Sequence, residues 1–142
     1  MDVVIHHNPN CGTSRNVLRI IEAAGYAPFV VEYLKTGWTE AQLRALLAAA
    51  GLSARDALRV SKSPAEELGL TDESVSEETL MAAMIKHPIL VNRPIVVTAK
   101  GVKLCRPSGE ILNLLDRWPA APFAKEDGDL IIDAAGARVA GA

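Results

Sequence analysis

The fold is decided by the stretch VVIHHNPNCGTSR, residues 3–15, in which a short apolar run leads directly into a loop that carries a cysteine. Val3–Ile5 is rich in β-branched residues, and the space before Pro9 is too short for a helix. This run therefore predicts a buried strand that ends near His7. Cys11 then lies where the strand stops and the next element begins.

Residues with helical spacing follow the loop. Beyond Ser14, apolar side chains recur every three or four positions, at Val17, Leu18, Ile21 and Ala24. This pattern predicts an amphipathic helix that Gly25 ends as a C-terminal cap. The run Pro28–Tyr33 returns to β character, so the chain opens with a strand, helix, strand unit, for which a right-handed crossover and parallel pairing are expected.

The middle of the chain reads as a helical insertion, about residues 39–87. Four capping residues each predict the start of a helical segment: Thr39, Ser53, Ser63 and Ser76. The first of these helices runs to Gly51, the second and third are short, and the last stops before His87–Pro88.

The last third of the chain returns to strands. Asn92–Thr98 and Val102–Cys105 predict a β-hairpin around the turn Lys100–Gly101. Ser108 opens a helix that Trp118–Pro119 ends, and residues 125–134 read as a last amphipathic helix. The expected order is β-α-β, an all-helical insertion, then β-β-α, within one α/β domain over residues 1–142.

Composition limits the possible functions. The chain has 142 residues, of which 49% are hydrophobic, and a formal net charge of -2. These values favour one globular domain and give no reason to expect a nucleic-acid partner. No apolar stretch predicts a membrane span or a secretory signal, and two cysteines indicate a reducing compartment, so a cytoplasmic location is expected.

Cys11 is the candidate nucleophile. At the start of a helix, free backbone N–H groups and the helix dipole lower the pKa of a thiol and also bind anions. Gly12 would let an oxyanion approach the backbone, and the hydroxyls of Thr13 and Ser14 lie nearby in sequence. The alternative is a buried cysteine that acts as a small hydrophobe. The loop sequence favours the reactive thiolate.

Three arginines are candidates for holding the anion. Arg93 and Arg106 flank the hairpin, each beside a proline, and Arg59 lies in the helical insertion. A guanidinium presents a fork of N–H donors that matches tetrahedral oxyanions. Each arginine could instead be an ordinary solvated surface residue.

Two histidines and a second cysteine leave alternatives open. His7 could donate to the thiolate, hold the loop, or be purely structural, and His6 must point to the other face of the strand. A metal site built from His6, His7 and Cys11 is therefore not expected. Cys105 is expected to be a half-buried strand cysteine, although it could lie near the site.

Spacing excludes two kinds of cysteine chemistry. A phosphatase loop of the C-x5-R type needs arginine at position 17, where Val17 stands. A C-x-x-C dithiol needs a second sulfur at position 14, where Ser14 stands. A redox cycle at Cys11 would therefore require an outside thiol.

Four blocks of sequence are decisive when taken together: HNPNCGTSRN at 7–16, HPILVNRPIVV at 87–97, LCRPS at 104–108 and KEDG at 125–128. In this order they closely resemble the glutaredoxin-coupled arsenate reductases of the thioredoxin-like superfamily. The resemblance covers almost the whole chain. One departure is His6, which stands where that family usually has an aromatic residue.

The resemblance implies a thioredoxin-like fold and a complete reaction. Cys11 would attack arsenate, Arg59, Arg93 and Arg106 would hold the oxyanion, and His7 and Ser14 would assist the thiolate. A cis peptide bond is implied before Pro94. Glutathione would act as co-substrate on the arsenic adduct, glutaredoxin would complete the reduction to arsenite, and no bound cofactor is implied.

Two other functions remain open from the sequence. One is a non-enzymatic thioredoxin-like regulator that binds a protein such as RNA polymerase, although redox-sensing relatives of that kind typically carry C-x-x-C, which Ser14 interrupts. The other is a general glutathione-dependent thiol oxidoreductase.

Overall fold

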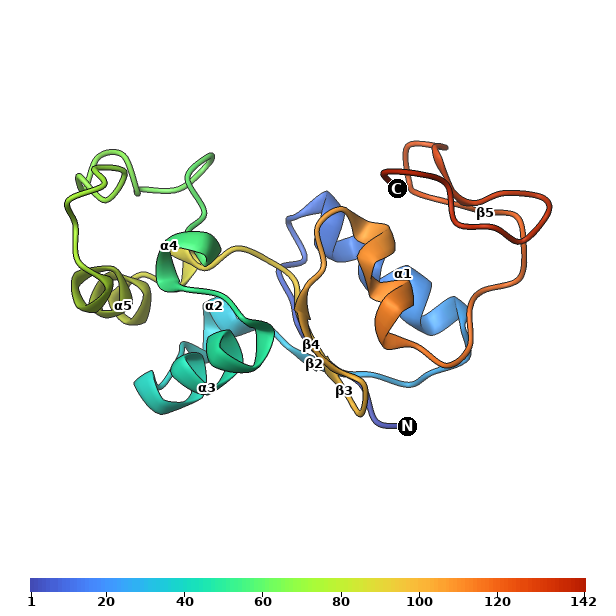
Figure 1. Cartoon of the computed structure of the whole chain (residues 1–142), viewed down its shortest axis with the longest axis horizontal. Coiled ribbons are helices and arrows are strands. Elements are labelled where there is room, and N and C mark those ends of the chain that lie inside the picture. The colour runs from blue at the N-terminus through green and yellow to red at the C-terminus, as the bar shows by residue number, and fades with distance from the viewer. The chain divides into compact units, whose positions relative to one another are not determined.

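The computed structural model describes residues 1–142 and separates them into two compact units (Figure 1). The first unit combines residues 1–32 with residues 93–142, and the second contains residues 33–92. The predicted helical insertion, residues 39–87, falls inside the second unit.

The first unit is built on a four-stranded sheet of order β2-β1-β3-β4. β1 (Val4–His6) pairs in parallel with β2 (Phe29–Val31) and antiparallel with β3 (Ile95–Thr98), which forms a hairpin with β4 (Gly101–Leu104). The helix α1 (Gly12–Ala23) connects β1 to β2. The predicted β-α-β opening and the β-hairpin are therefore both present.

The core of the first unit lies where α1 and η2 (Ser108–Leu114) pack together against the sheet (Figure 1). It includes apolar side chains from every layer: Ile5, Val17, Ile20, Ile21, Val96, Ile111, Leu112 and Ile131. The helix predicted from Ser108 is a 3-10 helix and ends before Trp118, whose indole Nε1–H donates to the Leu112 carbonyl at 3.2 Å.

The prediction of a last helix at residues 125–134 is wrong. This segment contributes to a two-stranded antiparallel sheet of β5 (Phe123–Ala124) and β6 (Leu130–Ile132). Gly128 adopts a φ of 93° in the turn between them. Two β-branched residues of β6, Ile131 and Ile132, are buried in the core, which favours a strand over the predicted helix.

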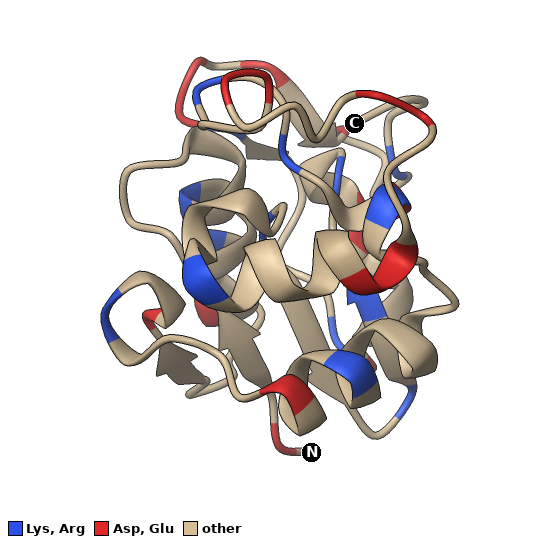
Figure 2. Ribbon diagram, turned by 90° about the vertical axis from the view of Figure 1, so that its left-hand side faces the viewer, with Lys and Arg blue, Asp and Glu red and all other residues tan.

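The second unit is helical. It contains α2 (Tyr33–Thr36), α3 (Glu40–Ala50), α4 (Ala54–Ala57), α5 (Glu77–Lys86) and η1 (Pro88–Leu90). Three of the four predicted capping residues begin helices as expected: Thr39, Ser53 and Ser76. Figure 2 shows acidic and basic residues interspersed along the ribbon. No helix in either unit is long and apolar enough to cross a membrane.

Two local predictions in the second unit are wrong. The segment after Ser63 makes turns in place of a helix, because Gly69, at a φ of 71°, ends the single turn in which the Leu68 amide donates to the Pro64 carbonyl. Tyr33 begins α2 and does not belong to a strand. Its ring stacks on Trp38, and its buried hydroxyl donates to the Val91 carbonyl at 2.9 Å.

Gly109 makes a close contact that predicts a stability effect. A Cβ at this position would lie 2.9 Å from the carbonyl carbon of Ala142 and closer still to its oxygen. Gly109→Ala should therefore lower the free energy of unfolding by ~1–3 kcal/mol, the usual range for overpacking. Thermal unfolding should reveal this loss. Gly12→Ala is the matched control, because its Cβ would meet only Arg15 Nη2 at 3.7 Å. Equal melting temperatures would contradict the prediction.

Candidate active site

Cys11 is the N-cap of α1, directly after the loop that leaves β1. Its backbone is extended (φ -104°, ψ 121°), and its carbonyl accepts the first helical hydrogen bond, from the Arg15 N–H at 3.0 Å. The residue is only 7% exposed. The thiol therefore lies at the positive end of the helix dipole in a largely water-excluded position.

Asn8–Cys11, here called the thiol loop, is closed by hydrogen bonds that centre on Asn8. The Asn8 carbonyl accepts from the Cys11 N–H at 3.0 Å, and the Asn8 side-chain oxygen accepts from the Asn10 N–H at 2.9 Å. The Asn8 N–H donates to the hydroxyl of Ser14 at 3.1 Å. These bonds fix the path of the loop at the start of α1.

Arg93 and Arg106 meet at Cys11. They precede β3 and follow β4, and the antiparallel register that places Ile95 opposite Leu104 brings the two ends of the hairpin together. Arg106 Nη1 lies 3.7 Å from the Cys11 sulfur and donates to the Arg93 carbonyl at 2.9 Å. The guanidinium of Arg93, a buried residue, also hydrogen-bonds to the sulfur.

The bonds Arg93–Pro94 and Arg106–Pro107 are both cis. The first agrees with the expectation for Pro94 that the resemblance raised. Neither the sequence nor the resemblance predicts the second. Both arginines whose side chains face Cys11 are therefore followed by a cis-proline.

The surroundings of Cys11 favour its thiolate. Burial alone would raise the pKa of this thiol, but hydrogen bonds from the Ser14 backbone N–H and from the side chains of Arg93 and Arg106 outweigh it. With the positive charge of Arg93, they lower the pKa of Cys11 to about 7, against an ordinary value of 9.0. A large fraction of the protein therefore carries a thiolate at neutral pH.

We expect this pKa to govern the reactivity of the thiol. Because the thiolate is the nucleophile, alkylation of Cys11 by iodoacetamide should accelerate as pH rises and reach half its maximal rate near pH 7. Mass spectrometry of the alkylated peptide would measure the rate at Cys11. A midpoint near the ordinary thiol value would contradict the prediction.

Cys105 serves as the internal control in that experiment. It is fully buried in the core, and burial raises its pKa to about 12. The prediction that Cys105 is a half-buried strand residue is therefore wrong. The residue follows the end of β4, and its side chain belongs to the buried core cluster. Cys105 should remain unmodified in the folded protein.

His7 and Ser14 form a buried pair beside the thiol loop. His7 Nδ1 lies 2.6 Å from the hydroxyl of Ser14. Burial, the largest influence, lowers the pKa of His7, so the imidazole is neutral at neutral pH. His7 thus hydrogen-bonds to the side-chain hydroxyl of Ser14, while the backbone N–H of Ser14 stabilises the thiolate of Cys11.

Gly12 and Thr13 form the first turn of α1 and are partly exposed beside the thiol. Their backbone positions are those at which helix N–H groups are free to bind an anion. Arg59 belongs to the second unit, where its Nε–H donates to the Ser61 carbonyl at 3.0 Å. Its participation in the site stays a prediction.

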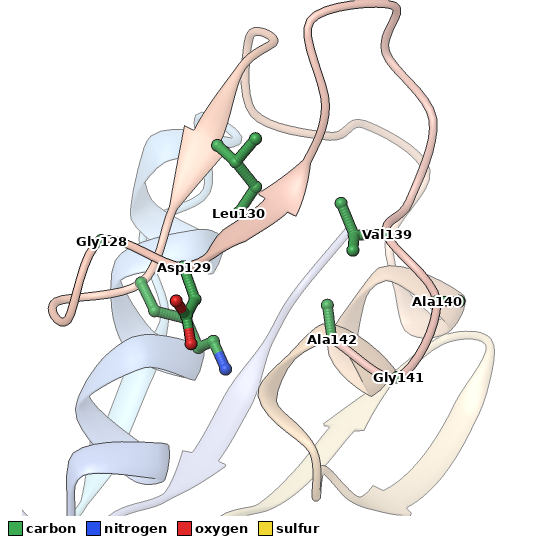
Figure 3. Close-up of a pocket in the computed structure, with 8 residues that line it drawn as sticks. Gly128, Asp129, Leu130, Val139, Ala140, Gly141 and Ala142 are labelled. Atoms are coloured by element: carbon green, nitrogen blue, oxygen red, sulfur yellow. The ribbon is translucent and has the colours of Figure 1, made fainter.

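No group of three or more histidine, cysteine, aspartate or glutamate side chains is arranged to hold a metal ion. A cavity of about 500 Å³ opens in the C-terminal part of the first unit, where Lys125, Asp129, Leu130 and Val139 are among the lining residues (Figure 3). Cys11, Arg93 and Arg106 do not line it, so this cavity is separate from the thiol site.

Arg15 and Glu126 are neighbours of the site that sequence reasoning missed. Both lie in the blocks that carry the family resemblance, HNPNCGTSRN and KEDG, but the sequence indicates no role for either. The Arg15 guanidinium donates to the Pro9 carbonyl in the thiol loop at 2.9 Å and to Glu126 at 3.0 Å. The separation of 111 residues between the two partners explains why sequence spacing could not pair them.

Comparisons with known proteins point to one family. Residues 6–114 match the model of the ArsC family. An arsenate reductase of Synechocystis sp. is 64% identical over 96% of this chain and 98% of its own length, and an arsenate reductase of Escherichia coli is 46% identical over 97% and 98%. The solved structure of an arsenate reductase from Vibrio cholerae aligns with a TM-score of 0.76 and 40% identity, covering 81% of this chain and 98% of that one.

Proposed function

The chain belongs to the ArsC family, and we propose that it reduces arsenate to arsenite through the thiolate of Cys11, with glutathione and glutaredoxin as its thiol partners. The observation that carries this proposal is the meeting of a lowered-pKa cysteine with two arginines at the start of α1. The choice of arsenate as substrate is supported by relatives of 46% to 64% identity that are named arsenate reductases.

In the first step, the Cys11 sulfur forms a bond to arsenic and one arsenate oxygen leaves as water after protonation. The glutathione thiol then forms a bond to arsenic in this arsenic(V) adduct, and a second oxygen leaves as water. The glutaredoxin thiolate attacks the glutathione sulfur, a mixed disulfide forms, and the electron pair of the broken sulfur–arsenic bond stays on arsenic, which becomes arsenic(III). Overall, two thiols lose two electrons and two protons to become one disulfide, and arsenate loses one oxygen as water. Hydrolysis of the remaining sulfur–arsenic bond releases arsenite and frees Cys11.

Each candidate site residue has a proposed part in this chemistry. Arg93 and Arg106 would neutralise the arsenate oxygens while keeping the sulfur ionised, and Arg59 would add a third cation. The backbone of Gly12 and Thr13 would donate to the oxyanion. The pair of His7 and Ser14 would hold the start of the helix, and Pro94 would shape the wall that faces the thiol.

The requirement for outside thiols follows from the single reactive sulfur. Cys105 is buried with a raised pKa, and Ser14 occupies the position at which a C-x-x-C partner would stand. A glutathione-dependent cycle also agrees with the cytoplasmic location expected for a chain with two free cysteines.

One turnover experiment tests the proposed function. Wild-type protein is given arsenate with glutathione and glutaredoxin, and arsenite is measured after omission of each component in turn. We expect arsenite to form at the full rate only in the complete mixture, and at a much lower rate when glutaredoxin is left out. In parallel, the protein is offered a glutathionylated peptide. Faster reduction of the peptide than of arsenate would instead identify a general thiol oxidoreductase.

A further inference from the structure

The chemistry proposed above gives no role to the block KEDG at residues 125–128. This block nevertheless lies against the start of α1, the helix that follows Cys11. The backbone N–H of Glu126 donates to the side-chain oxygen of Asn16 at 2.9 Å. Arg19 reaches the same oxygen at 3.3 Å and lies over the ring of Phe123 at 5.4 Å. The segment from Phe123 to Glu126 is therefore attached along the first turns of α1.

Arg15 extends this attachment into the thiol loop. One edge of its guanidinium donates to the Pro9 carbonyl, two residues before Cys11, at 2.9 Å. Its Nε–H is shared between the two carboxylate oxygens of Glu126, at 3.0 and 3.3 Å. A single side chain thus joins the loop that carries the nucleophile to the C-terminal segment.

Stability alone does not account for this arrangement. The side chains of Arg15 and Glu126 are 43% and 40% exposed. An exposed pair of this kind contributes roughly 0–1 kcal/mol to folding. Its effect on position is of a different kind, because the Cys11 sulfur lies 3.7 Å from Arg106 Nη1, which is longer than an N–H···O hydrogen bond. A small movement of the thiol loop would break that contact.

We propose that Arg15 and Glu126 are positioning residues for the reaction: held by the carboxylate of Glu126, the guanidinium of Arg15 fixes the Pro9 carbonyl and keeps Cys11 within reach of Arg93 and Arg106. Neither residue touches the substrate in this role. The inference rests on the proposed function for its kinetic consequences, whereas its effect on the thiol can be measured without arsenate.

An effect of charge and an effect of position would shift the pH midpoint of Cys11 alkylation in opposite directions in one variant, Glu126→Gln. Cys11 faces the cations of Arg93 and Arg106, and His7, beside Ser14, is influenced by the charges of Glu32, Arg15 and Glu22. Glu126→Gln removes a negative charge from this region, so a purely electrostatic effect would favour the thiolate and lower the midpoint of alkylation. If the carboxylate instead holds Arg15 in place, the loop loosens and the midpoint rises.

The experiment measures the pH midpoint of Cys11 alkylation and the kcat for arsenate in four variants. Arg15→Ala and Glu126→Gln should both raise the midpoint and lower kcat, by ~10-fold or more for Arg15→Ala, because displacement of a reacting group by about 1 Å can cost ~100-fold. In Arg15→Lys, the alkylation midpoint and kcat should both lie between the values of Arg15→Ala and those of the wild type. Lys100→Ala is the matched control: its side chain is equally exposed and likewise joins a carboxylate, Asp116, to a backbone carbonyl, that of Leu115.

The control should leave both quantities unchanged, and thermal unfolding should show that every variant is folded at the assay temperature. An unchanged or lowered midpoint in Glu126→Gln, or equal effects in Lys100→Ala, would overturn the positioning role. If wild-type protein fails to reduce arsenate, the proposed function fails, but the alkylation midpoints still decide whether the Arg15 contact positions the thiol.

Discussion

Replacing Cys11 by serine is expected to reduce kcat for arsenate by roughly 10⁴-fold or more, as is typical when the nucleophile of a covalent mechanism is lost. The serine hydroxyl is close in shape but remains protonated at neutral pH, so the hydrogen bonds from Arg93 and Arg106 no longer have an anion to stabilise. Arsenite formation with glutathione and glutaredoxin would be measured at saturating arsenate.

The matched control for this variant is Cys105→Ala. Cys105 lies in the core and its thiol has a pKa of about 12, so its removal should lower thermal stability while leaving kcat within about twofold of wild type. Full activity in Cys11→Ser, or a comparable loss in Cys105→Ala, would remove Cys11 from the role of nucleophile.

Loss of either arginine at the thiol should have the next largest effect. Each hydrogen bond to a charged partner contributes ~1.5–3 kcal/mol, so Arg93→Ala or Arg106→Ala should lower kcat/KM for arsenate by roughly 10- to 150-fold. Because both guanidinium groups lower the pKa of Cys11, the midpoint of its alkylation should also move above pH 7 in each variant. At neutral pH the variants then contain less thiolate.

A control separates this effect from the general loss of a cation. Arg117 belongs to the same unit, where its guanidinium lies 4.6 Å from the centre of the Tyr26 ring, and it makes no contact with Cys11. Arg117→Ala should leave kcat/KM and the alkylation midpoint unchanged. Wild-type kinetics in both Arg93→Ala and Arg106→Ala would show that these arginines do not hold the anion.

The elements that follow strong local rules were predictable from the sequence. The β-branched run of β1, the capping residues of α3 and α5 and the turn of the β3-β4 hairpin all appear where periodicity and caps indicated them. The errors occur where distant packing decides the local conformation. β6 forms because Ile131 and Ile132 are buried in the core, although the same residues also fit a helical pattern.

The residues of the site also divide into those that local sequence indicates and those that distant packing brings together. Cys11 at the start of a helix was recognisable because strand, loop and helix are contiguous in sequence. The meeting of Arg93 with Arg106 depends on hairpin register, which sequence could suggest but not measure. The contact of Arg15 with Glu126 spans 111 residues and depends on where the C-terminal sheet packs, so no local pattern could reveal it.

The central claim is that arsenate is reduced through the thiolate of Cys11, and alkylation of the wild-type protein tests it most directly. Samples treated with increasing amounts of iodoacetamide would be divided, one half for mass spectrometry of the Cys11 peptide and the other for arsenite release with glutathione and glutaredoxin. We predict that activity falls in proportion to the fraction of Cys11 that is alkylated and reaches zero when modification is complete. Undiminished arsenite release from fully alkylated protein would contradict the claim.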